Sequence, residues 1–209
     1  MKRAHQLIHC TLFFLITFLG LLADSDKKDD MSPDLDDNTQ PSHEFALIGG
    51  GCFWCTEAVF EKLDGVLEVI SGYAGGDLKN PTYKDICTGT SGHAEVIRIK
   101  FLPEIISFSK ILQTFGAAHD PTTLNRQGAD VGTQYRSTIM FYNEEQQKIA
   151  HLWKAKLAEK FEDPVVTEIV PVPKFYPAED YHQDYYAKNP NQGYCSFVIR
   201  PKLKKLGLE

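Results

Sequence analysis

Cys52 is the residue of this chain whose type and position best suit nucleophilic chemistry. An apolar strand is predicted over residues 45–48, three glycines follow, and Cys52 stands at the start of a helix predicted over residues 52–63. Unpaired backbone N–H groups and the positive end of the helix dipole stabilise a thiolate there. We therefore expect an acidic, nucleophilic Cys52, with glycines that admit the close approach of another backbone or a substrate. The alternative is a cysteine buried as a small apolar side chain.

Glu95 is a candidate proton donor. In the strand predicted over residues 94–101, alternation places Glu95 on the core-facing side with Ile97 and Phe101. A half-buried carboxyl at a strand end has a raised pKa and can stay protonated as a general acid. The alternative is a rim glutamate that turns outward where the strand frays.

An acidic thiol beside a neutral carboxylic acid suits the reduction of a sulfoxide. The acid protonates the oxygen, the thiolate attacks the sulfur, and the products are a thioether and a cysteine sulfenic acid. A second thiol then condenses with the sulfenic acid, and an external dithiol reduces the resulting disulfide. Phe53 and Trp54 follow Cys52 and could line an apolar pocket for a methyl group, or belong to the core.

The remaining elements must position these residues. The order strand, helix, strand, strand, helix, strand matches a split βαβ arrangement, with a helix and a strand added. We expect an α+β, ferredoxin-like sandwich with a mixed sheet and an irregular C-terminal tail. The further strands are predicted over 66–73, 136–142 and 165–172. Helices are predicted to begin at Pro103, to cover 144–161 and, as a short helix, to lie around 181–186, and a loop is predicted over 75–82.

The N-terminal residues differ in composition from the rest of the chain. Lys2 and Arg3 precede an apolar run over 12–22, which is typical of a signal peptide or signal anchor over residues 1–23. Residues 24–43 are acidic and polar, and are predicted to form a disordered linker before a catalytic domain over residues 44–209. Whether the segment is cleaved or retained, it predicts export to the periplasm, the exterior or a membrane surface.

Composition and motifs disfavour several other functions. A net charge of −6 over 209 residues argues against binding nucleic acid. The chain lacks a GxxxxGK[ST] phosphate loop, and its one CxxC pair has no second pair at zinc-finger spacing. Three alternatives stay open: a thiol–disulfide oxidoreductase using Cys52 and Cys55, a cysteine hydrolase with His93 or His182 as base, and a binding module held by disulfides.

Several short motifs together resemble the peptide methionine sulfoxide reductase A family. They are Gly51-Cys52-Phe53-Trp54-Cys55, Ser71-Gly72-Tyr73-Ala74-Gly75-Gly76, Pro81-Thr82-Tyr83, Gly92-His93-Ala94-Glu95 and Tyr181-His182-Gln183. The resemblance covers about residues 44–195. It implies a peptide-methionine (S)-S-oxide reductase that acts on free or protein-bound sulfoxide, uses no metal or organic cofactor, and is recycled by a thioredoxin-like dithiol. We expect a monomer.

The resemblance also implies roles for individual residues. Cys52 is the nucleophile and Glu95 the proton donor. Phe53 and Trp54 hold the substrate methyl group, while Tyr83 and Tyr135 donate hydrogen bonds to the sulfoxide oxygen. The full set of substrate-binding positions is Phe53, Trp54, Tyr83, Asp130, Tyr135 and His182.

The second thiol has two candidates. Gly193-Tyr194-Cys195 resembles the family's tail motif, and an irregular, proline-flanked tail would let Cys195 swing toward Cys52, so Cys195 is the preferred resolving cysteine. Cys55 is the alternative, because it lies one helical turn from Cys52, as in thioredoxin-like pairs. Cys87 is predicted to be a buried bystander.

Overall fold

A computed structural model of the chain describes residues 42–209. The predicted targeting segment and nearly all of the predicted linker lie outside the described residues. No helix within residues 42–209 is long and apolar enough to cross a membrane.

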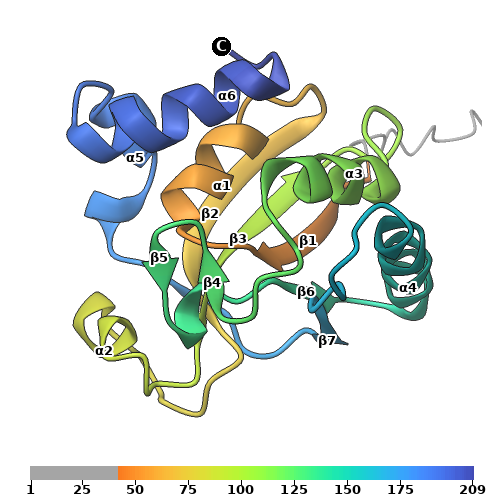
Figure 1. The fold of residues 1–209 in the computed structure, drawn as a ribbon, viewed down its shortest axis with the longest axis horizontal. Coiled ribbons are helices and arrows are strands. Elements are labelled where there is room, and N and C mark those ends of the chain that lie inside the picture. Colours follow the sequence, from red (N-terminus) through yellow and green to blue (C-terminus); the bar gives the residue numbers. More distant parts are fainter. Residues whose placement is uncertain (1–41) are drawn as a thin grey trace, which may run out of the picture. The chain divides into compact units, whose positions relative to one another are not determined.

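A six-stranded mixed sheet forms the centre of the fold (Figure 1). The strand order is β7-β6-β1-β3-β2-β8, in which β6 and β7 are parallel and the other neighbours are antiparallel. Strands β6, β1, β3 and β2, with their two crossover helices, make the predicted split βαβ arrangement, and β7 and β8 extend its edges. The strands are β1 (Glu44–Gly49), β2 (Val66–Ala74), β3 (Ala94–Phe101), β6 (Thr138–Phe141), β7 (Glu168–Pro171) and β8 (Tyr176–Pro177).

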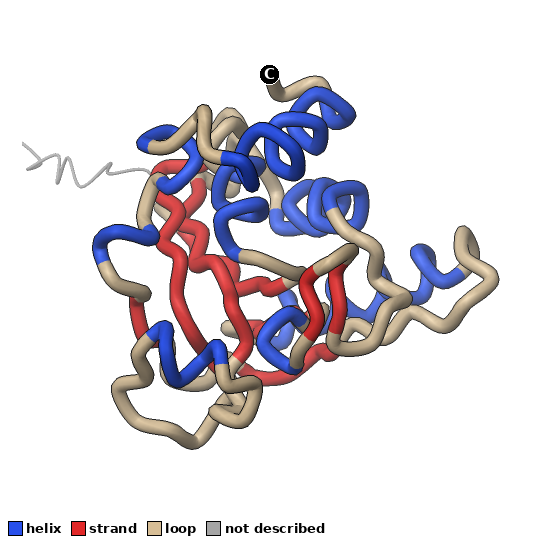
Figure 2. The backbone as a smooth tube through the Cα atoms, turned by 60° about the vertical axis from the view of Figure 1, so that its left-hand side comes forward, coloured by secondary structure: helices blue, strands red, loops and turns tan. Residues whose placement is uncertain are grey.

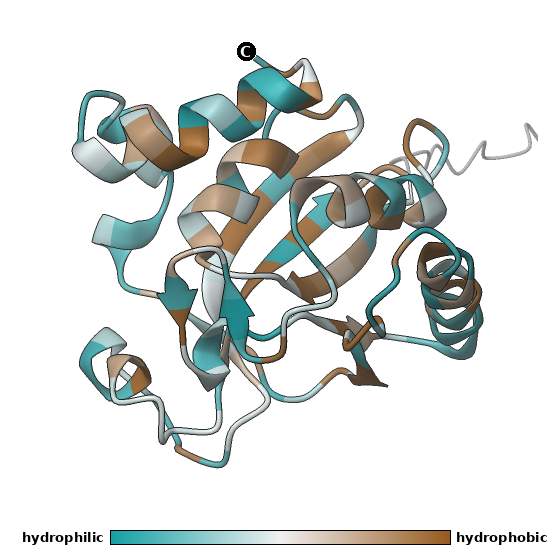
Figure 3. Ribbon diagram, in the orientation of Figure 1, coloured by the Kyte–Doolittle hydropathy of each residue, from teal (hydrophilic) through white to brown (hydrophobic). Residues whose placement is uncertain are grey.

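The helices α1 (Phe53–Phe60) and α3 (Phe108–Ala118) cover one face of this sheet (Figure 1). Their apolar side chains meet those of the strands in a core where Phe60, Ile99 and Phe115 are fully buried. A smaller cluster around Leu47 and Met140 fills the other face. Helix α4 (Glu144–Ala158) packs against α3 and the β6–β7 edge and is hydrophilic over most of its outer surface (Figure 3).

Local capping explains where the helices begin. Asn143 accepts a hydrogen bond from the Gln146 N–H and caps α4. Helix α3 begins after Ser107, which accepts from the Lys110 N–H, and not at Pro103 as predicted. The short helix α2 (Tyr83–Cys87) falls just after the predicted loop and was not foreseen. Thr82 and Asp85 form its reciprocal capping box.

A short hairpin stands beside the main sheet. Strands β4 (Arg126–Gln127) and β5 (Asp130–Val131) pair only with each other, and Figure 2 shows them apart from the six-stranded sheet. A single helical turn, η1 (Thr133–Tyr135), then leads into β6. The hairpin is mostly hydrophilic (Figure 3).

The prediction of an irregular C-terminal tail is wrong. After η2 (Asp180–His182) and α5 (Tyr185–Lys188), the chain forms a π-helical turn, η3 (Cys195–Ile199), that runs into α6 (Arg200–Leu206). Cys195, Ile199 and Leu203 recur every four residues and are all buried, which gives this segment a helical apolar stripe. Pro201 does not break it, because it lies in the first turn of α6, where a proline is tolerated.

Candidate active site

The turn from β1 into α1 places Cys52 at the N-cap of the helix. Cys52 is nearly buried, with 9% of its surface exposed. The glycines before it permit a tight approach, as expected. A Cβ atom on Gly49 would lie only 2.6 Å from the backbone oxygen of Glu95, and Gly51 has φ +90°, a conformation that favours glycine. The backbone that comes close is therefore that of Glu95.

The Glu95 carboxyl lies at the start of α1. It is 1% exposed, and its Oε2 accepts the backbone N–H of Phe53 at 3.0 Å. Burial raises the pKa of Glu95 to about 8, even though the Phe53 hydrogen bond favours the charged form. The predicted core-facing position and raised pKa of Glu95 are confirmed, and the outward-turned alternative is wrong.

The lowered pKa that was expected for Cys52 is found for Cys55 instead. Burial raises the pKa of the Cys52 thiol well above its usual value, and the hydrogen bond to Cys55 and the charge of Glu95 add to this. The hydrogen bond from Cys52 lowers the pKa of Cys55 to about 7, helped by Lys202 and opposed by burial. Cys52 lies at the helix start as predicted, but the effect of burial on its pKa exceeds any lowering of that pKa by the helix start.

An aromatic cluster adjoins Cys52, and His182 lies at its centre. The His182 ring lies 4.3 Å from the Tyr83 ring and 5.1 Å from the Phe53 ring, measured between centroids. The Trp54 Nε1–H donates to His182 Nδ1 at 3.1 Å, and the Trp54 ring stacks on Tyr185 at 3.6 Å. His182 is buried, and burial lowers its pKa. It therefore acts as a neutral acceptor that fixes the indole.

Tyr83 and Tyr135 bring two phenol groups toward the acid. Burial raises the pKa of both hydroxyls above their usual value, and the charge of Glu95 contributes to both shifts. Both groups therefore keep their protons and can donate hydrogen bonds. They come from α2 and η1, which are some fifty residues apart in sequence, and both hydroxyls lie close enough to Glu95 for its charge to affect their pKa.

The sulfur atoms lie in a different setting. Cys52, Cys55, Cys87 and Cys195 are all free thiols in the structure. The Cys55 Sγ lies 3.5 Å from the Tyr194 hydroxyl, which donates to Asp130 Oδ2 at 2.8 Å. This contact links the hairpin to the tail next to α1.

Two expectations about the other cysteines are wrong. Cys195 is fully buried within the π-helical turn, not carried on an irregular tail, and burial raises its pKa. Cys87 is exposed, because only Ile86 of the short helix α2 faces the core. Its thiol lies close enough to the Tyr83 hydroxyl to affect the pKa of that group.

Sequence reasoning missed two residues that complete the site. Glu179 accepts hydrogen bonds from the Tyr83 N–H at 2.8 Å and from the Tyr73 hydroxyl at 2.9 Å, and so anchors α2 beneath the aromatic cluster. It comes from a proline-rich stretch in which nothing distinguishes it. Tyr194 was noted only as part of the Cys195 motif, although its own hydroxyl contacts Cys55.

The two histidines proposed as hydrolase bases make hydrogen bonds to groups other than Cys52. Both ring nitrogens of His93 bind the loop at Gly76–Leu78, with Nδ1 accepting the Gly76 N–H at 3.1 Å and Nε2 lying 2.7 Å from the Leu78 oxygen. The Nδ1 atom of His182 is taken by Trp54. Within residues 42–209, no three His, Cys, Asp or Glu side chains are grouped so that they could hold a metal ion.

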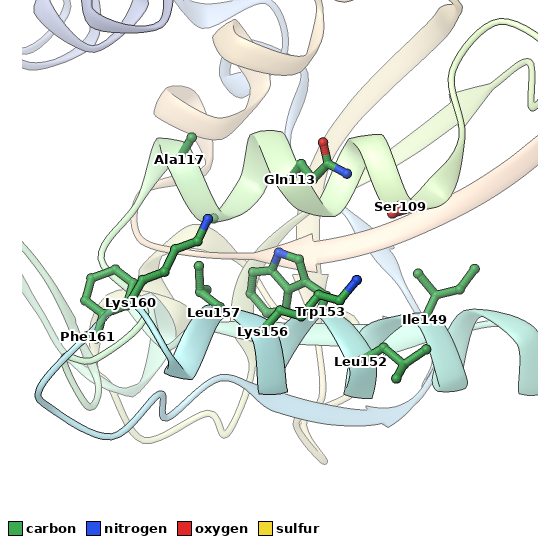
Figure 4. A pocket seen from close by; sticks show the side chains of 11 residues that line it. Ser109, Gln113, Ala117, Ile149, Leu152, Trp153, Lys156, Leu157, Lys160 and Phe161 are labelled. Atoms are coloured by element: carbon green, nitrogen blue, oxygen red, sulfur yellow. The ribbon is translucent and has the colours of Figure 1, made fainter.

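A larger cavity lies elsewhere. A groove of about 620 Å³ runs between α3 and α4, where Ile149, Trp153 and Leu157 face α3 (Figure 4). No cysteine and no carboxylate lines it. We therefore place the candidate active site at Cys52, although the cavity there, of about 220 Å³, is smaller than this groove.

The chain is similar to known proteins along the part that carries this site. Residues 44–208 match the family model described as "Peptide methionine sulfoxide reductase". The peptide methionine sulfoxide reductase MsrA 1 of Rhodopirellula baltica is 54% identical over 167 residues, which are 80% of this chain and 87% of that protein.

Solved structures show the same fold. Mxr1 of Saccharomyces cerevisiae in its reduced form superposes with a TM-score of 0.70 and 34% identity, over 73% of this chain and 89% of that one. Mxr1 in complex with Trx2 gives a TM-score of 0.50 and 26% identity, over 68% and 84% of the two chains.

Proposed function

Because this chain belongs to the peptide methionine sulfoxide reductase family, whose members reduce methionine sulfoxide with thiols, we propose that Cys52 and Glu95 carry out that reaction here on the S epimer. The observation that carries the proposal is the Glu95 carboxyl held at the start of α1. Its Oε2 accepts the N–H of the residue after the nucleophile, at 3.0 Å. Its pKa of about 8 keeps it protonated at neutral pH.

The first step transfers oxygen from the substrate to Cys52. Glu95 protonates the sulfoxide oxygen, and the Tyr83 and Tyr135 hydroxyls donate hydrogen bonds to it. Cys52 attacks the sulfur as a thiolate, and the S–O bond breaks. The OH group passes to Cys52 Sγ as the new S–S bond breaks, so methionine leaves and Cys52 becomes a sulfenic acid. Cys55 accepts the hydrogen bond from the Cys52 thiol and has the lower pKa, so it is placed to take the proton. The aromatic cluster of Phe53 and Trp54 holds the methyl group.

We further propose that Cys55 resolves the sulfenic acid. Residues three apart on a helix are neighbours, the Cys55 N–H donates to the Cys52 backbone oxygen at 3.1 Å, and the two thiols lie close enough to shift each other's pKa. Cys195 was preferred on the premise of a loose tail, and that premise is wrong because Cys195 is buried in η3. Condensation of the Cys55 thiol with the sulfenic acid releases water and forms the Cys52–Cys55 disulfide. A thioredoxin-like dithiol then reduces it, as the complex of the relative Mxr1 with Trx2 suggests.

The direct test separates the two epimers of a methionine sulfoxide peptide. We expect the full chain to reduce the S epimer with dithiothreitol and to leave the R epimer unchanged. The Cys52→Ser variant should lose this activity completely. Failure of the folded chain to reduce either epimer would refute the proposal, and equal turnover of both would refute its stereochemistry.

We also propose that the domain is exported from the cytoplasm. The support is the sequence alone: two basic residues, an apolar run over 12–22, and an acidic segment after it. Fractionation of cells that express the full chain should place the protein outside the cytoplasm. Recovery of an intact N-terminus from the cytoplasmic fraction would contradict this proposal.

A further inference from the structure

One carboxylate outside the reacting groups joins the elements that surround them. Glu179 lies just before η2, with 33% of its side chain exposed. Its Oε1 accepts the Tyr83 N–H at 2.8 Å, and its Oε2 accepts the Tyr73 hydroxyl at 2.9 Å. The reaction proposed above gives this carboxylate no part. A carboxylate that is bound to two separate elements fixes their positions relative to each other.

Few other interactions hold Tyr83 in place. Helix α2 has five residues, and Ile86 is its one buried side chain. Within residues 42–209, the bond from the Tyr83 N–H to Glu179 is the one hydrogen bond that joins Tyr83–Cys87 to an element distant in sequence. The first N–H groups of a helix have no partner inside the helix, so an outside acceptor there stabilises it. Glu179 is therefore the main polar anchor of the helix that carries the Tyr83 hydroxyl.

The other oxygen of Glu179 binds the strand next to the acid. Tyr73 is fully buried on β2 and is the register partner of Glu95 on β3. The spacing of neighbouring strands is fixed by their hydrogen bonds, so residues paired in this way keep their separation. The contacts that run from Glu95 through Tyr73 and Glu179 to Tyr83 therefore set where the Tyr83 hydroxyl lies relative to the acid. The charge of Glu95 affects the pKa of that hydroxyl, so the two groups lie close together.

The same residue contacts the centre of the aromatic cluster. The Glu179 backbone oxygen accepts the His182 N–H at 2.9 Å. Its Oε2 lies 3.9 Å from His182 Nε2, a buried atom that has no hydrogen-bond partner within residues 42–209. Because Nδ1 accepts from Trp54, the neutral ring carries its proton on Nε2, toward Glu179. Partial burial opposes a charge on Glu179, but the hydrogen bonds from Tyr83 and Tyr73 lower its pKa, so it is ionised at neutral pH.

We propose that Glu179 is a positioning residue for the reduction of the sulfoxide, because it holds the Tyr83 hydroxyl where it can donate to the oxygen that Glu95 protonates. The inference rests on the function proposed above. A hydrogen bond to that oxygen becomes stronger as the S–O bond breaks, because electron density then moves onto the oxygen. A displaced Tyr83 should therefore slow the chemical step and leave the binding of the substrate nearly unchanged.

Single-turnover kinetics isolate this step, because they need no reductant. The reduced full chain is mixed in excess with a methionine S-sulfoxide peptide, and formation of the methionine peptide is followed at several protein concentrations. We expect Glu179→Ala to lower the saturating rate about tenfold and to change the half-saturating concentration by less than about twofold. Glu179→Gln keeps an oxygen that can accept the Tyr83 N–H, so it should recover most of the rate. Asp180→Ala removes the next carboxylate along the chain, which is exposed, and as the matched control should change neither value.

A double variant shows whether Glu179 acts through Tyr83. If it does, adding Glu179→Ala to Tyr83→Phe should lower the rate no further than Tyr83→Phe alone. If the two losses instead multiply, Glu179 acts independently of the Tyr83 hydroxyl and the proposal is overturned. An unchanged rate in Glu179→Ala, an equal loss in Glu179→Gln, or an equal loss in the Asp180→Ala control would overturn it as well. Failure of the unchanged chain to form the methionine peptide would instead refute the underlying function.

Discussion

The groups on the two sides of Cys52 differ in protonation: those near Glu95 keep their protons, whereas Cys55 has a lowered pKa. Toward Glu95, burial keeps the carboxyl and the Tyr83 and Tyr135 phenols protonated, so this side holds hydrogen-bond donors. Toward Cys55, the hydrogen bond from Cys52, together with Lys202, stabilises a negative sulfur. Removing a sulfoxide oxygen requires a proton, whereas forming and breaking a disulfide requires a thiolate. One nucleophile serves both reactions because its two flanks differ in charge.

The largest expected effect is on the acid side. Glu95→Gln keeps the shape of the side chain but removes the proton, so kcat should fall at neutral pH by about 100-fold or more. The loss should shrink at low pH, because solvent partly replaces the acid. In the unchanged chain, kcat should fall as pH rises through about 8, where Glu95 loses its proton. Dithiothreitol-driven turnover across pH measures both, and equal profiles for the two proteins would remove Glu95 from the mechanism.

A stability measurement controls for misfolding of that variant. The pKa of Glu95 is raised from 4.5 to about 8, so the folded chain binds more protons than the unfolded chain between these values. The unchanged chain should therefore lose stability relative to Glu95→Gln as pH rises through that window. Thermal unfolding of both proteins at several pH values tests the sign. If Glu95→Gln instead lost stability relative to the unchanged chain as pH rises from about 4.5 to about 8, the carboxyl would not be buried as described.

A smaller effect should separate the two candidate resolving cysteines. After one equivalent of sulfoxide, Cys55→Ser should retain a Cys52 sulfenic acid, and its thioredoxin-driven turnover should fall at least about tenfold because no internal disulfide forms. Cys195→Ser should form the disulfide normally. Trapping with a sulfenic-acid reagent followed by peptide mass spectrometry distinguishes them. A trapped sulfenic acid in Cys195→Ser alone would restore Cys195 as the resolving thiol.

The smallest expected effect is on the sulfur side. Tyr194→Phe removes the hydroxyl that lies 3.5 Å from Cys55 Sγ and that lowers the pKa of Cys55, so this pKa should rise by less than about one unit in the variant. The alkylation rate of the Cys55 peptide across pH reports this pKa, in a Cys87→Ser background that removes the exposed thiol. A lower pKa in the variant would mean that the hydroxyl does not stabilise the thiolate.

Local patterns predicted the positions of Glu95 and Cys52 in the fold. The alternation of β3 placed Glu95 on the buried face, and the glycine turn before α1 placed Cys52 at a helix start. Each depends on a few neighbouring residues, so sequence alone could place them. The raised pKa of Glu95 followed from its position on the strand.

Features that depend on distant contacts could not be predicted in this way. His182 is buried, and the group that donates to it belongs to Trp54, which is 128 positions away in the sequence. The pKa of Cys52 depends on the water excluded by surrounding segments, which no local pattern reports. The C-terminal tail was predicted to be irregular because of its prolines, although the four-residue spacing of Cys195, Ile199 and Leu203 indicates a helix.

The stacking of Trp54 on Tyr185 gives the site an optical signal of its own. The chain has two tryptophans, and the other, Trp153, lies in the α3–α4 groove. Replacing Trp153 with phenylalanine leaves one indole, two residues from Cys52, as the source of tryptophan fluorescence. Thiols and disulfides quench indole emission to different extents. Formation and reduction of a disulfide at Cys52 should therefore change the emission of Trp54, without a label.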